Sequence, residues 1–404
     1  MKLVDLNAQF RAIEDDIRAA IERVLQHGRF VMGPEVHALE RELAEYCGVA
    51  HAVTAASGTD ALLMALMAKR VGPGDAVIVP AFTFVASAEV IQLVGAAPVF
   101  ADVDEDTFNL DPERLSEASR RVRDAGTLNL RGVMAVDLFG LPADYAAIDA
   151  VAGEHGLFVI ADAAQSFGGA LDGPHGRVRT GALGDLAATS FFPAKPLGCY
   201  GDGGALFTDD GRLADLARSI REHGMGAHRY EHLRTGICGR LDTIQAAVLR
   251  CKLKILDREL AARRRLAERY TRELEGVVEA PRIPPGYESA WAQYTVKTPA
   301  ERRDAVRAHL QNAGIPTAIY YPRPLHQQPA YRQADGAAAS LPVAEQLSKE
   351  VFSLPIHPYL GDDEQTRVIE AVKAAVRLTG RPSRGRVPPA SCSRSPSLPL
   401  NRGK

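Results

Sequence analysis

Lys195 lies in the segment SFFPAKPLGCYGDGG (190–204), which follows an apolar run and is punctuated by prolines and glycines typical of a tight turn. This lysine has no carboxylate neighbour for several residues, and its surroundings are partly apolar. Desolvation disfavours the ammonium form, and a neutral amine is what forms a Schiff base with a carbonyl. From this segment alone, a surface lysine in a loop is an equally good interpretation.

A second segment, LFVIADAAQSFGGAL, supplies a carboxylate. Its apolar run Leu157–Ala161 ends in Asp162. In an α/β protein such a run is a buried parallel strand, and residues at its carboxyl end line the ligand crevice. Asp162, followed by Gln165 and Ser166, fits either a helix N-cap or a functional carboxylate.

A third segment, AASGTDALLMAL, begins a helix with the small residues Ser57, Gly58 and Thr59. Free N–H groups and the helix dipole make such a start suitable for a phosphate, although the same residues also serve as ordinary caps. A Schiff-base lysine, a strand-end carboxylate and a phosphate cradle are together what pyridoxal 5'-phosphate (PLP) requires.

With these segments in view, the chain resembles the fold-type I PLP aminotransferases of the DegT–DnrJ–StrS family, which act on nucleotide-linked keto sugars. The resemblance covers roughly residues 1–378 and rests on many ordered motifs: GPEV (33–36), SGTDAL (57–62), PAFTFVAS (80–87), DAAQS (162–166), SFFPAKPLG (190–198), GDGGA (201–205), RLDTIQAA (240–247), YPRPLH (321–326) and SLPIHPYL (353–360).

The resemblance implies an α/β fold. A large PLP-binding domain over residues 1–241, with an N-terminal helix, would hold a mainly parallel seven-stranded sheet, and residues 242–378 would form a connector helix and a smaller α+β domain. The tail over 379–404 is rich in Pro, Ser and Arg, so we expect it to be disordered.

The residue pattern agrees with this organisation, because short apolar runs alternate with helical stretches. The expected strands are 51–55, 76–80, 98–101, 133–137, 157–162, 186–192 and 205–208, and the expected N-terminal helices are 10–26 and 35–46. One long helix is expected from Asp242 to about Leu274, with Asp242 and Gln245 as a capping box. In the smaller domain we expect strands near 294–298, 317–321 and 351–354.

By resemblance, Lys195 carries the Schiff base and then moves the proton, and Asp162 pairs with the pyridine nitrogen of the cofactor. Gln165 contacts the ring hydroxyl, Phe84 stacks on the ring, and the phosphate is bound by Gly58, Thr59 and Ser190. Cys238 stands where the family has an asparagine that reaches the phosphate of the neighbouring subunit. The resemblance therefore also implies a homodimer with shared active sites, with Cys238 as a weaker hydrogen-bond donor.

Within the family, the chain resembles the enzymes that aminate UDP-2-acetamido-2-deoxy-3-oxo-glucuronate with L-glutamate. That resemblance implies substrate contacts by Arg240, Tyr320 and Tyr321, with Gly28, Phe30 and His326 as further candidates. Tyr320 stands where that group can have histidine, so a dTDP-3- or 4-keto-6-deoxyhexose aminotransferase is an alternative. A non-catalytic PLP-binding regulator is a third interpretation. A sugar dehydratase of this fold is disfavoured, because those enzymes replace the lysine by histidine.

Composition excludes several other classes. A net charge of −2 argues against binding to nucleic acid or to a membrane surface. No apolar run is long enough to span a membrane, and the charged, amphipathic N-terminal residues lead us to expect no signal peptide. The five cysteines form no CxxC motif, no metal site is expected, and a cytoplasmic location is expected.

Overall fold

The computed structural model describes residues 1–331 and 340–379. The tail predicted as disordered lies outside the described residues except for Thr379, which belongs to the last helix.

The centre of the structure is a seven-stranded sheet in the order β1-β9-β8-β5-β4-β2-β3. Strands β2 to β5 and β8 run parallel, while β9 is antiparallel to both of its neighbours. The predicted, mainly parallel seven-stranded sheet is therefore confirmed. Its strands are β1 (His51–Ala55), β2 (Asp75–Pro80), β3 (Ala97–Ala101), β4 (Asn129–Val136), β5 (Phe158–Asp162), β8 (Leu186–Ser190) and β9 (Gly204–Thr208).

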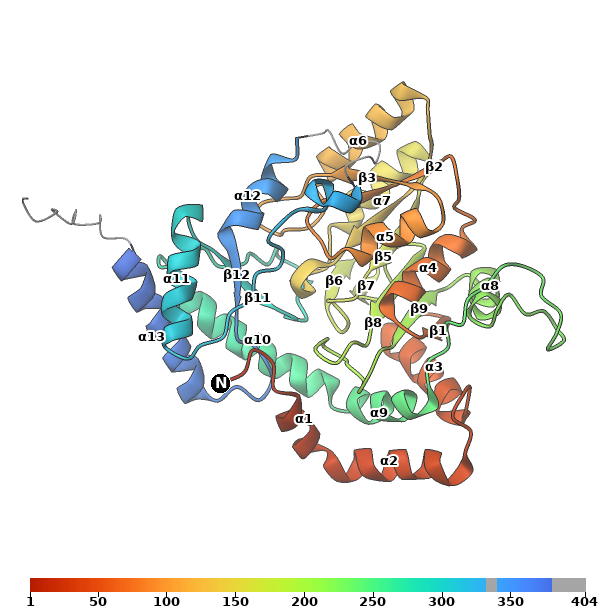
Figure 1. Cartoon of the computed structure of the whole chain (residues 1–404), viewed down its shortest axis with the longest axis horizontal. Helices are drawn as coiled ribbons and strands as arrows, with labels where there is room; N and C mark the ends of the chain where they lie inside the picture. The colour runs from red at the N-terminus through yellow and green to blue at the C-terminus, as the bar shows by residue number, and fades with distance from the viewer. Residues whose placement is uncertain (332–339, 380–404) are drawn as a thin grey trace, which may run out of the picture.

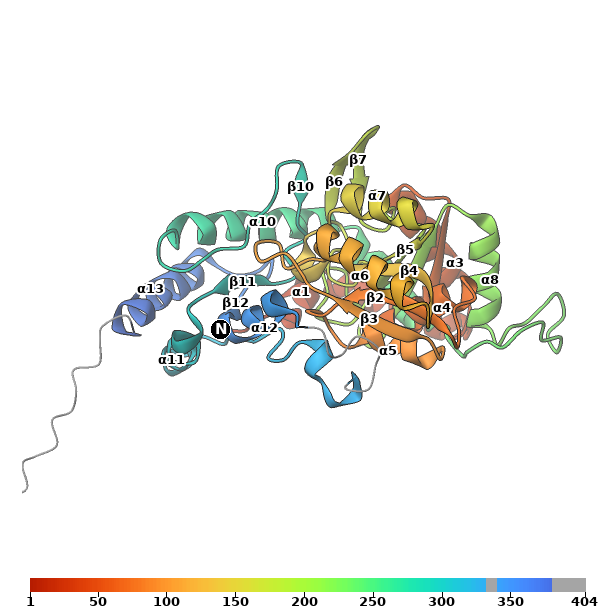
Figure 2. The same cartoon turned by 90° about the horizontal axis from the view of Figure 1, so that it is seen from above.

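Helices cover both faces of this sheet, which explains why its strands are continuous apolar runs. Each face has its own apolar core. The covering helices are α3 (Pro34–Cys47), α4 (Gly58–Ala68), α5 (Ala86–Leu93), α6 (Pro112–Ala125), α7 (Tyr145–His155) and α8 (Gly211–Arg221), and Figures 1 and 2 show them around the sheet.

The N-terminal segment forms two helices where one was expected. These are α1 (Leu6–Ala12) and α2 (Glu14–His27), which meet at Ile13. Helix α2 buries Ile17 and Val24 against Val248 of α9 (Thr243–Leu253).

The predicted single helix from Asp242 to Leu274 is also wrong. The chain breaks at Lys254 and Ile255 between α9 and α10 (Leu256–Glu273). The predicted capping box is absent as well, because Asp242 makes no side-chain cap bond and Gln245 binds the backbone of Tyr200 instead.

A smaller lobe with its own apolar core follows α10, and Figures 1 and 2 show it beside the large sheet. Its elements are β11 (Tyr294–Lys297), α11 (Ala300–Asn312), α12 (Pro342–Glu350), β12 (Val351–Leu354) and α13 (Asp362–Thr379), with β11 antiparallel to β12. The strand expected at 317–321 is wrong, because that segment makes one isolated bridge, Ala318 to Ser353. The domain boundary at residues 241/242 stays a proposal.

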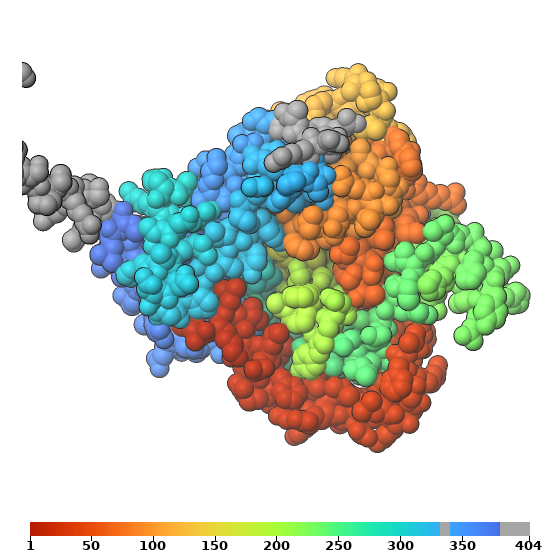
Figure 3. Space-filling model, viewed as in Figure 1, coloured from red at the N-terminus to blue at the C-terminus, as the bar shows by residue number. Residues whose placement is uncertain are grey.

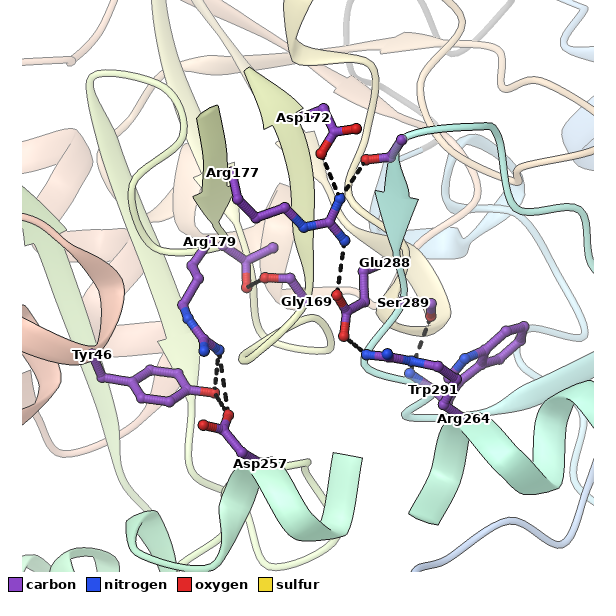
Figure 4. Close-up of polar contacts among 12 residues, drawn as sticks. Tyr46, Gly169, Asp172, Arg177, Arg179, Asp257, Arg264, Glu288, Ser289 and Trp291 are labelled. Carbon is purple, nitrogen blue, oxygen red and sulfur yellow. Dashed lines mark hydrogen bonds and ion pairs between the residues drawn. The ribbon is translucent and has the colours of Figure 1, made fainter. Parts of the chain in front are cut away.

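An unpredicted three-stranded sheet joins the large sheet region to α10. Its strands are β6 (Ala170–Gly173), β7 (Gly176–Arg179) and β10 (Tyr287–Glu288). In Figure 4, Arg177 binds Asp172 and Glu288, Arg264 of α10 pairs with the same Glu288, and Arg179 lies against Tyr46 and Asp257. These pairs fix the start of the smaller lobe against the larger one.

No helix within residues 1–331 and 340–379 is both long enough and apolar enough to cross a membrane.

Candidate active site

A cavity of about 460 Å³ opens at the carboxyl ends of β5 and β8. In Figure 3 the yellow-green segment that follows β8 reaches the surface in the middle of the visible face. Most of the predicted site residues line this cavity: Gly58, Thr59, Phe84, Asp162, Gln165, Ser190, Lys195, Tyr320 and Tyr321. Segments far apart in the sequence therefore converge as the sequence predicts.

Asp162 is the last residue of β5 and is only 5% exposed. Ser87 Oγ donates a 2.7 Å hydrogen bond to its Oδ2, and the Ala164 N–H donates a 3.1 Å bond to its Oδ1. Burial raises the pKa of Asp162, although these two donors and Lys195 oppose the shift. Because a buried carboxylate is stabilised by a facing cation, this site suits a protonated ring nitrogen.

Lys195 lies in the turn after β8 and reaches the same cavity. Desolvation lowers its pKa, and the charge of Asp162 opposes that shift. The lysine is therefore closer to its neutral, nucleophilic form than a surface lysine would be.

The N-terminus of α4 forms the opposite end of the cavity. Ser57 is the N-cap, and its Oγ accepts from the Asp60 N–H. The first N–H groups of a helix have no intrahelical acceptor, so those of Gly58 and Thr59 are available to an anion. A Cβ on Gly58 would lie 2.6 Å from the Cβ of Ser190, so only glycine lets this helix start approach the strand so closely.

Gln165, Tyr321 and Phe84 form another wall. The backbone N–H of Phe139 donates a 2.7 Å bond to Gln165 Oε1, and Gln165 Nε2 donates a 3.3 Å bond to the Tyr321 hydroxyl. This arrangement orients the amide donors of Gln165. Phe84 is 52% exposed and its ring centroid lies 6.1 Å from that of Tyr321, so its face is open to a planar ligand.

Five predicted residues do not line this cavity. Gly28 ends α2 with φ +69°, which explains the glycine by backbone geometry, and Phe30 is 47% exposed. Arg240 Nη2 donates to Cys238 Sγ at 3.0 Å near the surface. His326 is buried and its Nε2 lies 3.1 Å from Glu345 Oε1, away from the residues that line the cavity, so its contact with substrate stays a prediction.

Two further residues at the site, Ser87 and Gln293, were not predicted from the sequence. Ser87 belongs to the PAFTFVAS motif but lies 75 residues from Asp162, and no spacing rule connects the two. Gln293 lines the cavity from the segment before β11. Phe192 and Asp202 also line it and flank the lysine turn.

The residues present fit PLP. The cavity holds a lysine with a lowered pKa, a buried carboxylate with a raised pKa and a helix start with available N–H groups. These correspond to the aldehyde, the ring nitrogen and the phosphate of the cofactor.

Comparisons with known proteins agree with this site. The DegT/DnrJ/EryC1/StrS aminotransferase family matches residues 11–373. A Pseudomonas aeruginosa protein named UDP-2-acetamido-2-deoxy-3-oxo-D-glucuronate aminotransferase is 46% identical over 361 residues, which cover 89% of this chain and 96% of that protein. A Streptomyces venezuelae protein named dTDP-3-amino-3,4,6-trideoxy-alpha-D-glucose transaminase is 41% identical over 372 residues, 92% of this chain and 94% of that one.

Solved structures give the same result. An aminotransferase of this family from Brucella abortus superposes with a TM-score of 0.90 at 50% identity, covering 94% of this chain and all of that one. DesV from S. venezuelae, solved in complex with a ketimine intermediate, superposes with a TM-score of 0.86 at 41% identity, covering 93% and 98%. The chain therefore belongs to the DegT/DnrJ/EryC1/StrS aminotransferase family.

Proposed function

We propose that this protein transfers the amino group of L-glutamate to a keto carbon of a nucleotide-linked sugar, with PLP bound by Lys195. The observation that carries the proposal is the meeting of Lys195, Asp162 and the α4 N-terminus in one cavity. When bound there, the cofactor supplies an electron sink for the negative charge left when a proton leaves the substrate carbon.

Each residue that lines the cavity has a separate role toward the cofactor. Lys195, whose pKa is lowered by desolvation, would hold the cofactor through its aldehyde. Once the amine of the donor has taken the place of Lys195 on that carbon, the freed lysine amine would carry the proton to and from the reacting carbon. Asp162, held by Ser87, stabilises positive charge at the ring nitrogen. Gln165 would donate to the ring oxygen, Phe84 would cover the ring, and Gly58, Thr59 and Ser190 would hold the phosphate; their shared place on the cavity wall supports these roles.

For the sugar, we favour UDP-2-acetamido-2-deoxy-3-oxo-glucuronate. The relative named for that substrate is 46% identical, whereas the dTDP-sugar transaminase is 41% identical. A dTDP-3- or 4-keto-6-deoxyhexose is the second candidate. Tyr320, which stands where the uronate-aminating group can have histidine, lines the cavity at a position predicted to contact the sugar. The intact lysine and aspartate favour an enzyme over a regulator.

We also propose a homodimer whose active sites draw on both subunits. Cys238, Arg240, Gly28 and Phe30 lie outside the cavity of their own chain, as residues that serve a partner would. The exposed side chain of Phe30 supports such a contact. The cytoplasmic location stays a prediction from the sequence.

The purified protein loaded with PLP tests the proposal. We expect an absorbance band that L-glutamate bleaches and that returns when the correct keto sugar is added. Mass spectrometry of products from a panel of UDP- and dTDP-linked keto sugars then identifies the substrate. A chain that binds PLP without any bleaching by amino donors would contradict the aminotransferase proposal.

A further inference from the structure

Lys252 is a buried lysine that the reaction itself does not use. It lies on α9 and is 1% exposed. Its Nζ donates a 2.6 Å hydrogen bond to the carbonyl oxygen of Gly198 and lies 4.1 Å from the ring centroid of Tyr200. Burying an ammonium is costly unless such partners compensate it, so this lysine is held at a defined place.

Gly198 closes the turn that carries Lys195. The N–H of Lys195 donates to the carbonyl of Phe192 at 2.9 Å, and the N–H of Cys199 donates to the carbonyl of Phe191 at 2.8 Å. A Cβ on Gly198 would lie 2.4 Å from the carbonyl oxygen of Pro193, so the turn has no spare room. A shift of the Gly198 carbonyl therefore moves the backbone of Lys195 with it.

Helix α9 anchors this turn at two points. Gln245 Oε1 accepts from the N–H of Tyr200 at 2.8 Å, and Lys252 holds Gly198. Positions 245 and 252 are seven residues, about two helical turns, apart and lie on one face. A neighbouring side of α9 packs on α2 through Ala247, Val248 and Cys251, and Figure 1 shows α9 between α2 and the large sheet. The turn thus rests on a rigid support.

The carboxylate of Glu259 favours the protonated form of the Lys252 amine, and burial opposes it. Burial lowers its pKa to about 8, and the carboxylate of Glu259 opposes the shift. Glu259 is itself buried and accepts bonds from Tyr359 and Gln9 at 2.6 and 2.8 Å.

We propose that Lys252 is a positioning residue for Lys195, acting through the Gly198 carbonyl and the Tyr200 ring to fix where the catalytic amine reaches into the cavity. This inference rests on the proposed function, in which Lys195 moves the proton.

The test compares Lys252→Met with Lys254→Met, the same change at an exposed lysine two residues away. All rates are expressed per cofactor trapped on Lys195 by borohydride. For Lys252→Met we expect kcat of the glutamate half-reaction to fall about 10- to 100-fold, the loss typical of a catalytic group displaced by about 1 Å. We expect KM to change by less than about threefold, because binding is not the step affected.

Two further readouts separate positioning from stability. With α-deuterated glutamate the isotope effect on Lys252→Met should exceed that of the wild type, since proton transfer becomes slower. The pH midpoint of the absorbance band of the resting holoenzyme should move upward, since a nearby buried positive charge is lost. Lys254→Met should match the wild type in every measurement.

The inference would be overturned if Lys252→Met melted at a lower temperature but kept three wild-type values: the kcat per trapped cofactor, the isotope effect and the pH midpoint. If this variant fails to fold, Tyr200→Leu replaces it, because that side chain is partly exposed. It should lower kcat in the same direction by a smaller factor, and an unchanged kcat would equally overturn the inference. If the wild type traps no cofactor on Lys195, both the proposed function and this inference are refuted. If the wild type traps cofactor and Lys252→Met has the same kinetic values as the wild type, only the inference is refuted.

Discussion

At the scale of single residues, Lys195 and Asp162 illustrate how one cavity changes two ionisable groups in opposite directions. Desolvation lowers the pKa of the lysine and raises that of the aspartate, and each charge opposes the shift of the other. Both groups are thereby moved toward neutrality. A cationic ring nitrogen beside Asp162 would favour the charged form of the aspartate, so the two groups suit a cofactor that needs an anion at one point and an amine at another.

The first prediction concerns Lys195→Ala. The variant loses both the group that binds the aldehyde and the group that moves the proton, so single-turnover transamination should fall by at least about 10³-fold. Stopped-flow absorbance with L-glutamate measures the rate, and borohydride followed by peptide mapping should find no adduct at position 195. Lys254→Ala serves as the control and should keep both. Retained turnover in Lys195→Ala would contradict the assignment.

The second prediction concerns Asp137, which lies behind the site. Burial raises its pKa to about 7, although bonds from Ser166, Tyr145 and the Ala143 N–H oppose the shift. The folded pKa exceeds the unfolded value of about 3.9. Stability from the protonated carboxyl is therefore present below about pH 4 and is lost as pH rises to 7.

Asp137→Asn removes this titration. Its free energy of unfolding relative to the wild type should rise by about 1.4 kcal/mol per pH unit toward pH 7 and then level off. Urea unfolding at several pH values measures the difference. Asp215→Asn, at a carboxylate whose side chain is 80% exposed, is the control and should give a nearly constant difference. A constant difference for Asp137→Asn would show that Asp137 keeps an ordinary pKa.

At the scale of elements, the α4 N-terminus is placed by its packing on β8 and β9. Gly58→Ala would bring a Cβ to 2.6 Å from Ser190 Cβ and 3.2 Å from its Oγ, so the helix start must move away from the strand. PLP affinity should weaken about tenfold or more, the equivalent of about 1.4 kcal/mol. Fluorescence titration of the apoprotein with PLP measures this change.

Gly153→Ala in α7 is the matched control, because a Cβ there meets no atom within 4 Å and alanine is favoured in a helix interior. It should leave PLP affinity unchanged. Equal affinity in both variants would mean that this helix start does not bind the phosphate.

The elements also show which features a sequence reveals. Buried strands such as β5 and β8 are continuous apolar runs, so all seven strands of the large sheet are predictable. Strands β6 and β7 are short and carry exposed charges such as Arg177, so they have no apolar run to identify them. The break at Lys254 has no proline or glycine to mark it.

Only some of the residues that form and support the candidate site can be predicted from the sequence. Lys195 and Asp162 follow apolar runs and belong to recognisable motifs. Ser87 and Lys252 act through contacts across 75 and 54 residues, which only the folded chain creates. Lys252 also lies in a basic helix, where a solvated lysine is the usual expectation.

At the scale of the whole molecule, Arg240 and Cys238 lie outside the cavity of their own chain, and this position bears on whether two subunits share their active sites. An isologous dimer places the same surface of each subunit against the other, so a residue outside one cavity can complete the second. Arg240→Ala alone should then lower activity at least about tenfold, because a guanidinium that binds a carboxylate or phosphate is worth more than about 1.4 kcal/mol.

Mixed dimers of Lys195→Ala and Arg240→Ala test the sharing of sites directly. If Arg240 serves the partner's cavity, one cavity of each mixed dimer receives Lys195 from one subunit and Arg240 from the other, while the second cavity lacks both. With random pairing, about half of the dimers are mixed and one of their two sites is intact, so co-expression should restore about a quarter of wild-type activity. If Arg240 serves its own cavity, each site of a mixed dimer contains one defect. The co-expressed sample would then be no more active than the average of the two parents, and shared active sites would be wrong for this chain.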